Sequence, residues 1–228
     1  GLGGIRIGFE QACKAKRIET ECVLTSEIKS YAVETLKHNH NHDNFIGDIF
    51  QLKNEDIPDF DFLFAGFPCQ PFSASGKRNG FADTRGTLFF EVERILRYKK
   101  PQGFILENVE GMVKHDLENK GDIIGRTLKT ILNKLEKELD YKVSWKVLNS
   151  VNFGVPQSRK RIFIIGTQKN KVSLEKFTPT FKKLKDILES GKETMNTDFT
   201  KKLLSHFSVE ELYGKSIKDK RGGKNNIH

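Results

Sequence analysis

Short apolar runs alternate with amphipathic stretches over the first two thirds of the chain. Runs of a few apolar residues predict buried strands, and apolar positions repeated every three to four residues predict helices. The predicted strands cover residues 21–25, 45–46, 61–65, 103–107, 142–148 and 161–166. The predicted helices cover residues 5–16, 29–39, 87–98 and 123–139. This alternation is typical of an α/β fold with a mostly parallel sheet.

The same pattern indicates where the chain divides. Residues 71–86 are rich in Ser, Gly, Lys and Asn, which is the composition of a loop. A loop of this length is usually functional or disordered. After about residue 170, apolar residues become sparse and lysines more frequent. We therefore expect a compact domain over residues 1–168, and a linker with the start of a further region over residues 169–228.

The chain carries a formal net charge of +9 and has an isoelectric point of about 9.3. This balance fits a polyanionic partner such as nucleic acid, and equally a soluble surface rich in lysine. Three cysteines without regular spacing argue against a disulfide framework and fit a reducing cytosol. No apolar run approaches the ~18–20 residues that span a bilayer, and no signal peptide is visible. Because the chain starts at Gly1 rather than methionine, we expect its front end to lie outside this sequence.

Gly1, Leu2, Gly3 and Gly4 stand directly before the first predicted helix. Glycines allow the backbone to approach a ligand closely, and a helix N-terminus offers free N–H groups, as in nucleotide-binding folds. Glu27 follows at the end of the next predicted strand, where an acid can bind ribose hydroxyls. An ordinary tight turn explains the glycines equally well, so these residues alone do not decide between the two interpretations.

A cysteine between two prolines follows the predicted strand at residues 61–65, in the segment Gly66-Phe67-Pro68-Cys69-Gln70-Pro71-Phe72-Ser73. Open α/β sheets place their sites at the carboxyl ends of strands. The prolines restrict the backbone and hold the sulfur of Cys69 in one direction. A thiolate there suits nucleophilic catalysis. The other interpretation is a buried cysteine that packs as a small apolar residue.

Glu107 ends the predicted strand at residues 103–107, so its carboxylate should emerge at the same edge as Cys69. Arg159 and Arg161 lie where the last predicted strand begins. In extended backbone these two arginines point to the same side, which suits a paired grip on a carboxylate, carbonyl or phosphate. Taken alone, the glutamate also fits a helix cap or a salt bridge, and the arginines a solvated basic edge.

In their order along the chain, the segments GLGG, SE, GDI, GFPCQPFS, RGTLFF, ENV and QSRKR resemble the bacterial cytosine carbon-5 DNA methyltransferases. These are the methylases of type II restriction–modification systems, and the resemblance extends over residues 1–168. It implies a Rossmann-like S-adenosylmethionine-dependent methyltransferase fold, with a mixed, mostly parallel sheet and helices on both faces. It also implies a catalytic domain that lacks most of its target-recognition domain.

The resemblance assigns catalytic roles to four residues. Cys69 would attack carbon-6 of cytosine, and Glu107 would contact the ring nitrogen and amino group and neutralise the charge that builds. Arg161 would hold the base carbonyl, and Arg159 would orient the neighbouring carboxylate or backbone. Because a duplex hides both reacting carbons within the stack, the cytosine must be flipped out.

The resemblance also implies S-adenosylmethionine as cofactor, bound by Gly1, Leu2, Gly3, Gly4, Glu27, Ile28, Asp48, Ile49, Pro68 and Leu88. Residues 73–85 resemble the family's loop that closes over DNA. DNA contacts are expected from Gln70, Ser73, Ser75, Lys77 and Arg85. No metal is needed. The alternating His38, His40 and His42 look like metal ligands, but we interpret them as surface residues.

Duplex DNA is therefore the expected substrate, with a cognate restriction endonuclease in the same system but not in direct contact. We expect a monomer in the bacterial cytoplasm. Two alternatives stay open: a transfer RNA cytosine methyltransferase, as in one eukaryotic branch of the family, and a non-catalytic DNA-binding relic. The intact Cys69, Glu107, Arg159 and Arg161 argue against the relic. Because the family's target-recognition domain and final motif are missing from this sequence, we expect either a fragment or a chain that a second polypeptide completes. The chain by itself is expected to be weak or inactive.

Overall fold

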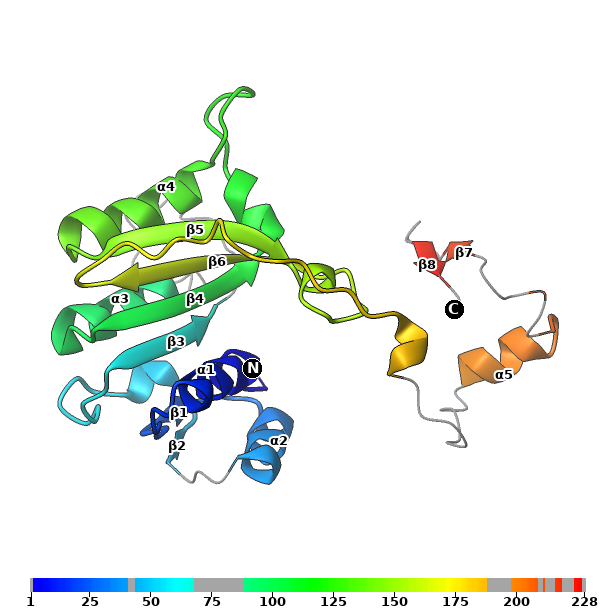
Figure 1. Ribbon diagram of the computed structural model, residues 1–228, viewed down its shortest axis with the longest axis horizontal. Helices are drawn as coiled ribbons and strands as arrows, with labels where there is room; N and C mark the ends of the chain where they lie inside the picture. The colour runs from blue at the N-terminus through cyan, green and yellow to red at the C-terminus, as the bar shows by residue number, and fades with distance from the viewer. Residues whose placement is uncertain are drawn as a thin grey trace, which may run out of the picture. The chain divides into compact units, whose positions relative to one another are not determined.

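The centre of the first part of the chain is a four-stranded sheet in the order β3-β4-β6-β5 (Figure 1). Its strands are β3 (Phe62–Gly66), β4 (Gly103–Val109), β5 (Lys142–Asn149) and β6 (Lys160–Thr167). β3 pairs with β4 in parallel, whereas β6 pairs antiparallel with both β4 and β5. β3, β4 and β5 therefore run in one direction and β6 runs against them. The expected mixed, mostly parallel sheet is confirmed.

The computed structural model describes residues 2–40, 44–67, 88–187, 198–208, 211, 216–218 and 224–226. The chain divides into two units, residues 1–183 and residues 184–228. The division therefore falls later than the expected boundary at residue 168. Residues beyond that boundary pack along the sheet, because Ser144 donates a hydrogen bond to the carbonyl of Val172 and Phe153 forms a β-bridge with Thr180. It stays a prediction that the second unit contains the start of a target-recognition region.

The first unit also contains a short parallel pair, β1 (Thr25–Ser26) and β2 (Phe45–Ile46). Its helices are α1 (Gly4–Ala15), α2 (Ser30–Asn39), α3 (Leu88–Lys99) and α4 (Arg126–Asn133). Single turns are η1 (Ile49–Gln51), η2 (Glu110–Lys114), the π-helical η3 (Lys134–Glu138) and η4 (Ser150–Asn152). The second unit contains η5 (Leu184–Asp186), α5 (Asp198–Leu204) and the antiparallel pair β7 (Ser216–Lys218) and β8 (Lys224–Asn226). Within the described ranges, no helix has both the length and the apolar character needed to cross a membrane.

Two predicted elements are shorter than expected. The strand predicted at residues 21–25 pairs only from Thr25 onward. The helix predicted from residue 123 begins at Arg126, because the backbone N–H of Gly125 donates a hydrogen bond to the carbonyl of Val113. A side chain at Gly125 would overlap the carbonyl oxygen of His115. This close backbone approach sets where α4 can start.

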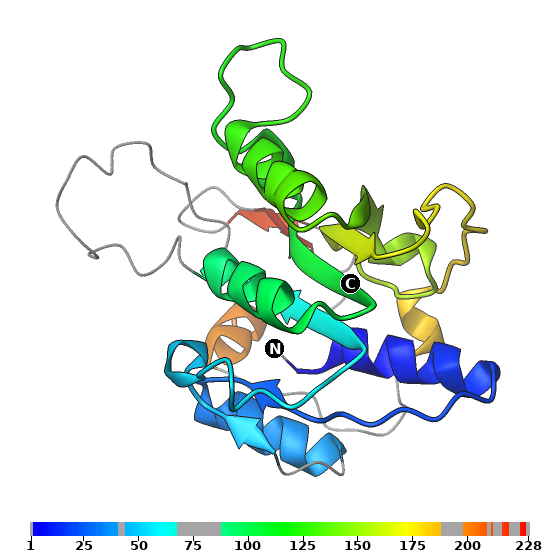
Figure 2. The same ribbon diagram turned by 90° about the vertical axis from the view of Figure 1, so that its left-hand side faces the viewer.

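Helices cover both faces of the sheet, as expected. Phe9 of α1 packs on Phe62 and Phe64, with ring centroids 5.2 Å and 4.9 Å apart. Because side chains alternate along a strand, Leu63 and Ala65 face the other side, where they join the core under α3 and α4. Figure 2 shows α1 and α3 on opposite sides of β3.

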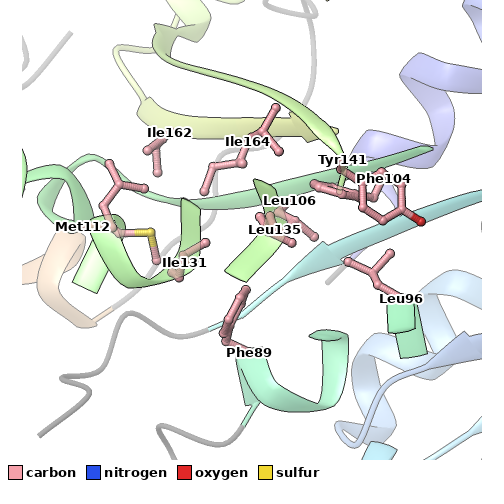
Figure 3. Close-up of a cluster of buried hydrophobic side chains, with 12 residues drawn as sticks. Phe89, Leu96, Phe104, Leu106, Met112, Ile131, Leu135, Tyr141, Ile162 and Ile164 are labelled. Carbon is pink, nitrogen blue, oxygen red and sulfur yellow. The ribbon is translucent and has the colours of Figure 1, made fainter. Parts of the chain in front are cut away.

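The main core lies between that second face of the sheet and helices α3 and α4. Removing each large apolar side chain of this core from water contributes about 1.5–3 kcal/mol to the stability of the fold. Figure 3 shows this core, to which strands, helices and turns all contribute side chains. The labelled side chains are those of Phe89, Leu96, Phe104, Leu106, Met112, Ile131, Leu135, Tyr141, Ile162 and Ile164.

Gly166 of β6 lies directly against the ring of Phe104, and an added Cβ atom would overlap that ring. We expect Gly166→Ala to lower the free energy of unfolding by about 1–3 kcal/mol, the usual cost of overpacking a core. Gly8 is the matched control, because it lies within α1 and an added Cβ meets nothing within 4 Å. Gly8→Ala should instead raise the free energy of unfolding by about 0.5–1 kcal/mol. Urea unfolding followed by circular dichroism measures both, and a Gly166→Ala protein as stable as the wild type would contradict this packing.

Candidate functional site

The carboxyl ends of β3 and β4 lie side by side at one edge of the sheet. Gly66, the last residue of β3, stands opposite Glu107 of β4 in the parallel register. A Cβ atom at Gly66 would lie 3.3 Å from Oε2 of Glu107, so the missing side chain leaves room for the carboxylate. The chain therefore leaves β3 beside Glu107, whereas β4 continues two residues further, to Val109.

Glu107 forms an ion pair with Arg161 of β6, whose Nε lies 3.0 Å from Oε1. In the antiparallel register Arg161 stands opposite Val109, so the two charged side chains are diagonal neighbours, within reach of each other. The side chains of Arg161 and Glu107 are 23% and 26% exposed, which leaves both accessible. Nη1 of Arg161 also donates to the carbonyl of Lys160 at 2.7 Å, which restrains the guanidinium. A carboxylate and a guanidinium are thus held together at this edge.

Arg159 lies just before β6 and is exposed. Its backbone N–H donates to Oδ1 of Asn149 at 2.9 Å, and its carbonyl accepts from the N–H of Ser150 at 3.2 Å. The main chain of Arg159 is therefore fixed. The described contacts join Glu107 to Arg161, and a paired grip by both arginines stays a prediction.

A glycine turn precedes α1, as expected. Gly3 has φ of +81°, in the left-handed region that favours glycine, and Gly4 is the first helical residue. Among the described residues, no side chain caps this helix, so its first N–H groups stay available to a ligand. Leu2 is exposed beside the turn.

Glu27 and Asp48 follow the two strands of the short parallel pair, so they lie at the same edge. Oε1 of Glu27 accepts a hydrogen bond from the N–H of Lys29 at 3.1 Å, and Oδ1 of Asp48 accepts from Phe50 at 3.0 Å. Burial opposes ionisation of Glu27, but hydrogen bonds to the charged form, including those from the backbone N–H groups of Lys29 and Ile28, leave its pKa below the ordinary value. An ionised carboxylate thus stands at the end of β1.

Three further residues of the predicted cofactor site are described. The side chain of Ile28 is 71% exposed, which leaves an apolar surface beside Glu27. Ile49 is half-buried and packs on the small core around Leu52 and Ile57. Leu88 begins α3 and is half-buried.

Several predicted site residues lie outside the described residues. They are Gly1, Pro68, Cys69, Gln70, Ser73, Ser75, Lys77 and Arg85, together with the rest of the predicted loop at residues 73–85. The nucleophile and the DNA contacts therefore stay predictions.

The interpretation of the alternating histidines as surface residues is wrong for His40. His38 is exposed on α2, but His40 follows the end of that helix in extended backbone and is only 8% exposed. Its ring packs beneath the glycine turn, where a Cβ atom at Gly3 would lie 2.7 Å from Nε2. His42 lies outside the described residues. In the described part of the chain, no group of three or more His, Cys, Asp or Glu side chains is arranged to hold a metal.

Asn108 had no predicted role. It is buried and donates a hydrogen bond to the carbonyl of Phe67. The signal was present, because Asn108 alternates with Leu106 and Phe104 and is thus a polar residue on the apolar face of its strand. A buried amide in such a place needs hydrogen-bond partners, and here one partner is the residue before Pro68.

Solved methyltransferase structures share this fold. The Dnmt2 methyltransferase of S. pombe superposes with a TM-score of 0.64 at 21% sequence identity, over 87% of this chain and 63% of that one. A DNMT2 variant from Spodoptera frugiperda superposes with a TM-score of 0.63 at 24% identity, over 85% and 58% of the two chains. The fold is that of the methyltransferases.

The model of the C-5 cytosine-specific DNA methylases matches residues 1–225, and the chain belongs to this family. It is 60% identical to the Type II methyltransferase M.NgoBV of Neisseria gonorrhoeae over 228 residues, and 48% identical to M.BanI of Aneurinibacillus aneurinilyticus over 252. Both matches cover all of this chain, but only 54% and 56% of the relatives. The chain thus spans about half the length of these curated relatives.

Proposed function

We propose that the protein transfers a methyl group from S-adenosylmethionine to carbon-5 of cytosine in duplex DNA. The observation that carries the proposal is the ion pair of Glu107 and Arg161 beside the end of β3, from which the chain continues to Cys69. Membership of the family supports the same reaction. Because the chain spans about half the length of these relatives, the activity is proposed for the whole protein.

Cytosine carbon-5 is a weak nucleophile, so the thiolate of Cys69 first forms a bond to carbon-6. The electron pair of the 5,6 double bond is then available at carbon-5, while negative charge spreads to the ring nitrogen and the carbonyl. When the base displaces the contact with Arg161, Glu107 takes up a proton from solvent and donates it to that nitrogen. Arg161 then donates to the carbonyl, and both interactions stabilise this charge. Arg159 orients the carboxylate or the backbone beside them. Carbon-5 would take up the methyl group that the bound cofactor supplies. Its proton then passes to solvent, the electron pair restores the double bond as the bond to Cys69 breaks, and the ring nitrogen returns its proton to Glu107.

The target base needs to leave the helix for this reaction, because stacking in duplex DNA covers both carbon-5 and carbon-6. The exposed edge that holds Glu107 and Arg161 supports this requirement, since both side chains are accessible to a base presented from outside. Flipping is therefore part of the proposed mechanism.

The residues at the glycine turn and at the ends of β1 and β2 fit S-adenosylmethionine, with Leu2 and Gly4 at the turn and Leu88 at the start of α3. Contacts from Gly1 and Pro68 stay predictions. Backbone N–H groups near Gly3 suit the amino acid end, and the ionised carboxylate of Glu27 suits two ribose hydroxyls. The exposed side chain of Ile28 suits the adenine ring, beside Asp48 and Ile49. When bound, the cofactor supplies an electrophilic methyl group.

Glu27→Gln is expected to weaken S-adenosylmethionine binding by about 10- to 100-fold, since charge-assisted hydrogen bonds contribute about 1.5–3 kcal/mol. Isothermal titration calorimetry on the full-length protein measures the affinity. Glu21→Gln is the matched control, because Glu21 is exposed and lies before β1 rather than at its carboxyl end. Equal affinities for the two variants would remove Glu27 from the cofactor site.

Transfer of a labelled methyl group to duplex DNA and to transfer RNA tests the proposed function. We expect label in duplex DNA, and a covalent complex with duplex DNA in which the target base is 5-fluorocytosine. Label in transfer RNA alone would replace the proposal with an RNA methyltransferase. The absence of both the label and the covalent complex would instead support a non-catalytic DNA-binding protein.

The relatives named as Type II methyltransferases support a role in a restriction–modification system. In such a role the protein acts on the same DNA as a restriction endonuclease without contacting that enzyme. DNA from cells that express the full-length protein should then resist a cognate endonuclease. The monomeric state and the bacterial cytoplasm stay predictions.

A further inference from the structure

Asn108 is a polar residue on the side of β4 that the main core covers. Its side chain is 3% exposed, and it points to the opposite face of the sheet from Glu107, because neighbouring residues of a strand alternate. Nδ2 donates to the carbonyl oxygen of Phe67 at 2.7 Å, and Oδ1 accepts from the N–H of Val109 at 2.8 Å. Both ends of the buried amide thus have partners.

These two partners determine how the amide is oriented. The N–H of Val109 can only be matched by an oxygen, and the carbonyl of Phe67 only by the amide nitrogen. The backbone ladder between β3 and β4 ends where Gly66 stands opposite Glu107. One residue further along each strand, the side chain of Asn108 provides the next hydrogen bond, to the carbonyl of Phe67 just after β3.

The carbonyl held by Asn108 belongs to the peptide bond between Phe67 and Pro68. Because the proline nitrogen carries no hydrogen, this oxygen is the only main-chain hydrogen-bonding group of that peptide. The residue before a proline is already restricted to extended conformations. The ring of Phe67 also packs on Phe89, with centroids 5.7 Å apart. Together these restraints fix the carbonyl and the ring of Phe67, directly before Pro68.

We propose that Asn108 is a positioning residue for the nucleophile. By holding the carbonyl of Phe67, it sets the direction in which the chain leaves β3 toward Cys69, and thereby the aim of the sulfur at carbon-6. The proposal rests on the proposed function of Cys69. Glu107 and Asn108 then serve the same reaction from opposite faces of β4, one by contacting the base and the other by directing the nucleophile.

Asn108→Asp tests this role, because it keeps the shape of the side chain and replaces the donor with an oxygen. We expect the rate of methyl transfer in a single turnover to fall about 10- to 100-fold, the effect of a small misplacement of reacting atoms. The rate of covalent complex formation with 5-fluorocytosine DNA should fall equally, while KM for S-adenosylmethionine stays within about twofold. Both are measured on the full-length protein.

Tyr141→Phe is the matched control, since it also removes one buried hydrogen bond to a backbone carbonyl, from Tyr141 Oη to Pro101 at 2.8 Å. This variant should lose stability but keep the single-turnover rate within about twofold. An unchanged rate in Asn108→Asp, or an equal loss in Tyr141→Phe, would overturn the proposal. Asn108→Ala repeats the test if the aspartate variant does not fold, and failure of both to fold would reduce Asn108 to a stabilising residue. An inactive wild type would instead contradict the proposed function itself.

Discussion

Cys69→Ser is expected to abolish methyl transfer by the full-length protein while leaving its affinity for S-adenosylmethionine nearly unchanged. A serine hydroxyl is a far weaker nucleophile than a thiolate at neutral pH, so the bond to carbon-6 no longer forms. The substitution exchanges only the sulfur for an oxygen, and the proposed role of this side chain is to bond the base rather than to bind the cofactor. Labelled methyl transfer measures the activity, and isothermal titration calorimetry measures the affinity.

Cys13→Ser is the matched control for this experiment. Cys13 is a half-buried free cysteine on α1, and the same exchange of sulfur for oxygen there should leave the activity within about twofold. Activity retained by Cys69→Ser would refute the assignment of the nucleophile. Activity lost in both variants would point to a general sensitivity of the protein rather than to covalent catalysis.

Glu107→Gln is expected to slow the chemical step by about 10²- to 10⁴-fold, the range typical of lost acid–base catalysis. Glutamine keeps the shape of the side chain, but it cannot supply a proton to the ring nitrogen. It also leaves the guanidinium of Arg161 without its charged partner. Single-turnover methyl transfer with saturating DNA and cofactor measures this step directly, and a reduction below about tenfold would count against the role of Glu107.

Glu110→Gln is the matched control for Glu107. Glu110 lies in the next turn of the chain and pairs with Lys160 at 3.3 Å, with both side chains about half exposed. Such surface ion pairs contribute at most about 1 kcal/mol. Its rate should therefore stay within about twofold of the wild type, so that a shared loss of rate would indicate a nonspecific effect of charge.

Most of the element order could be predicted from the chain alone. The apolar runs at residues 61–65 and 103–107 became β3 and β4, and the run at residues 45–46 became β2. These predictions succeed because the spacing of apolar residues reflects which face of an element is buried. The direction of pairing and the extent of each element depend on neighbours, and this is why α4 starts only after Gly125 meets the backbone of His115.

The positions of polar side chains were less accessible to prediction. His40 looked like one of several surface histidines, but it packs against the turn at Gly3, far away in the chain. Asn108 stood beside the predicted catalytic glutamate without a role, and its contact with Phe67 depends on β3 lying next to β4. Neither contact follows from local spacing, because each joins residues that only the fold brings together.

The sequence by itself determined the α/β character of the protein, the glycine turn and the placing of Glu107 near the carboxyl end of a strand, although β4 continues to Val109. Periodicity is a local property, so a single chain suffices to read it. Only the tertiary structure decided that Glu107 pairs with Arg161 and that Asn108 holds the bond before Pro68. Those contacts arise from the registers of β3, β4 and β6, which are set by the packing of whole elements and not by any one segment.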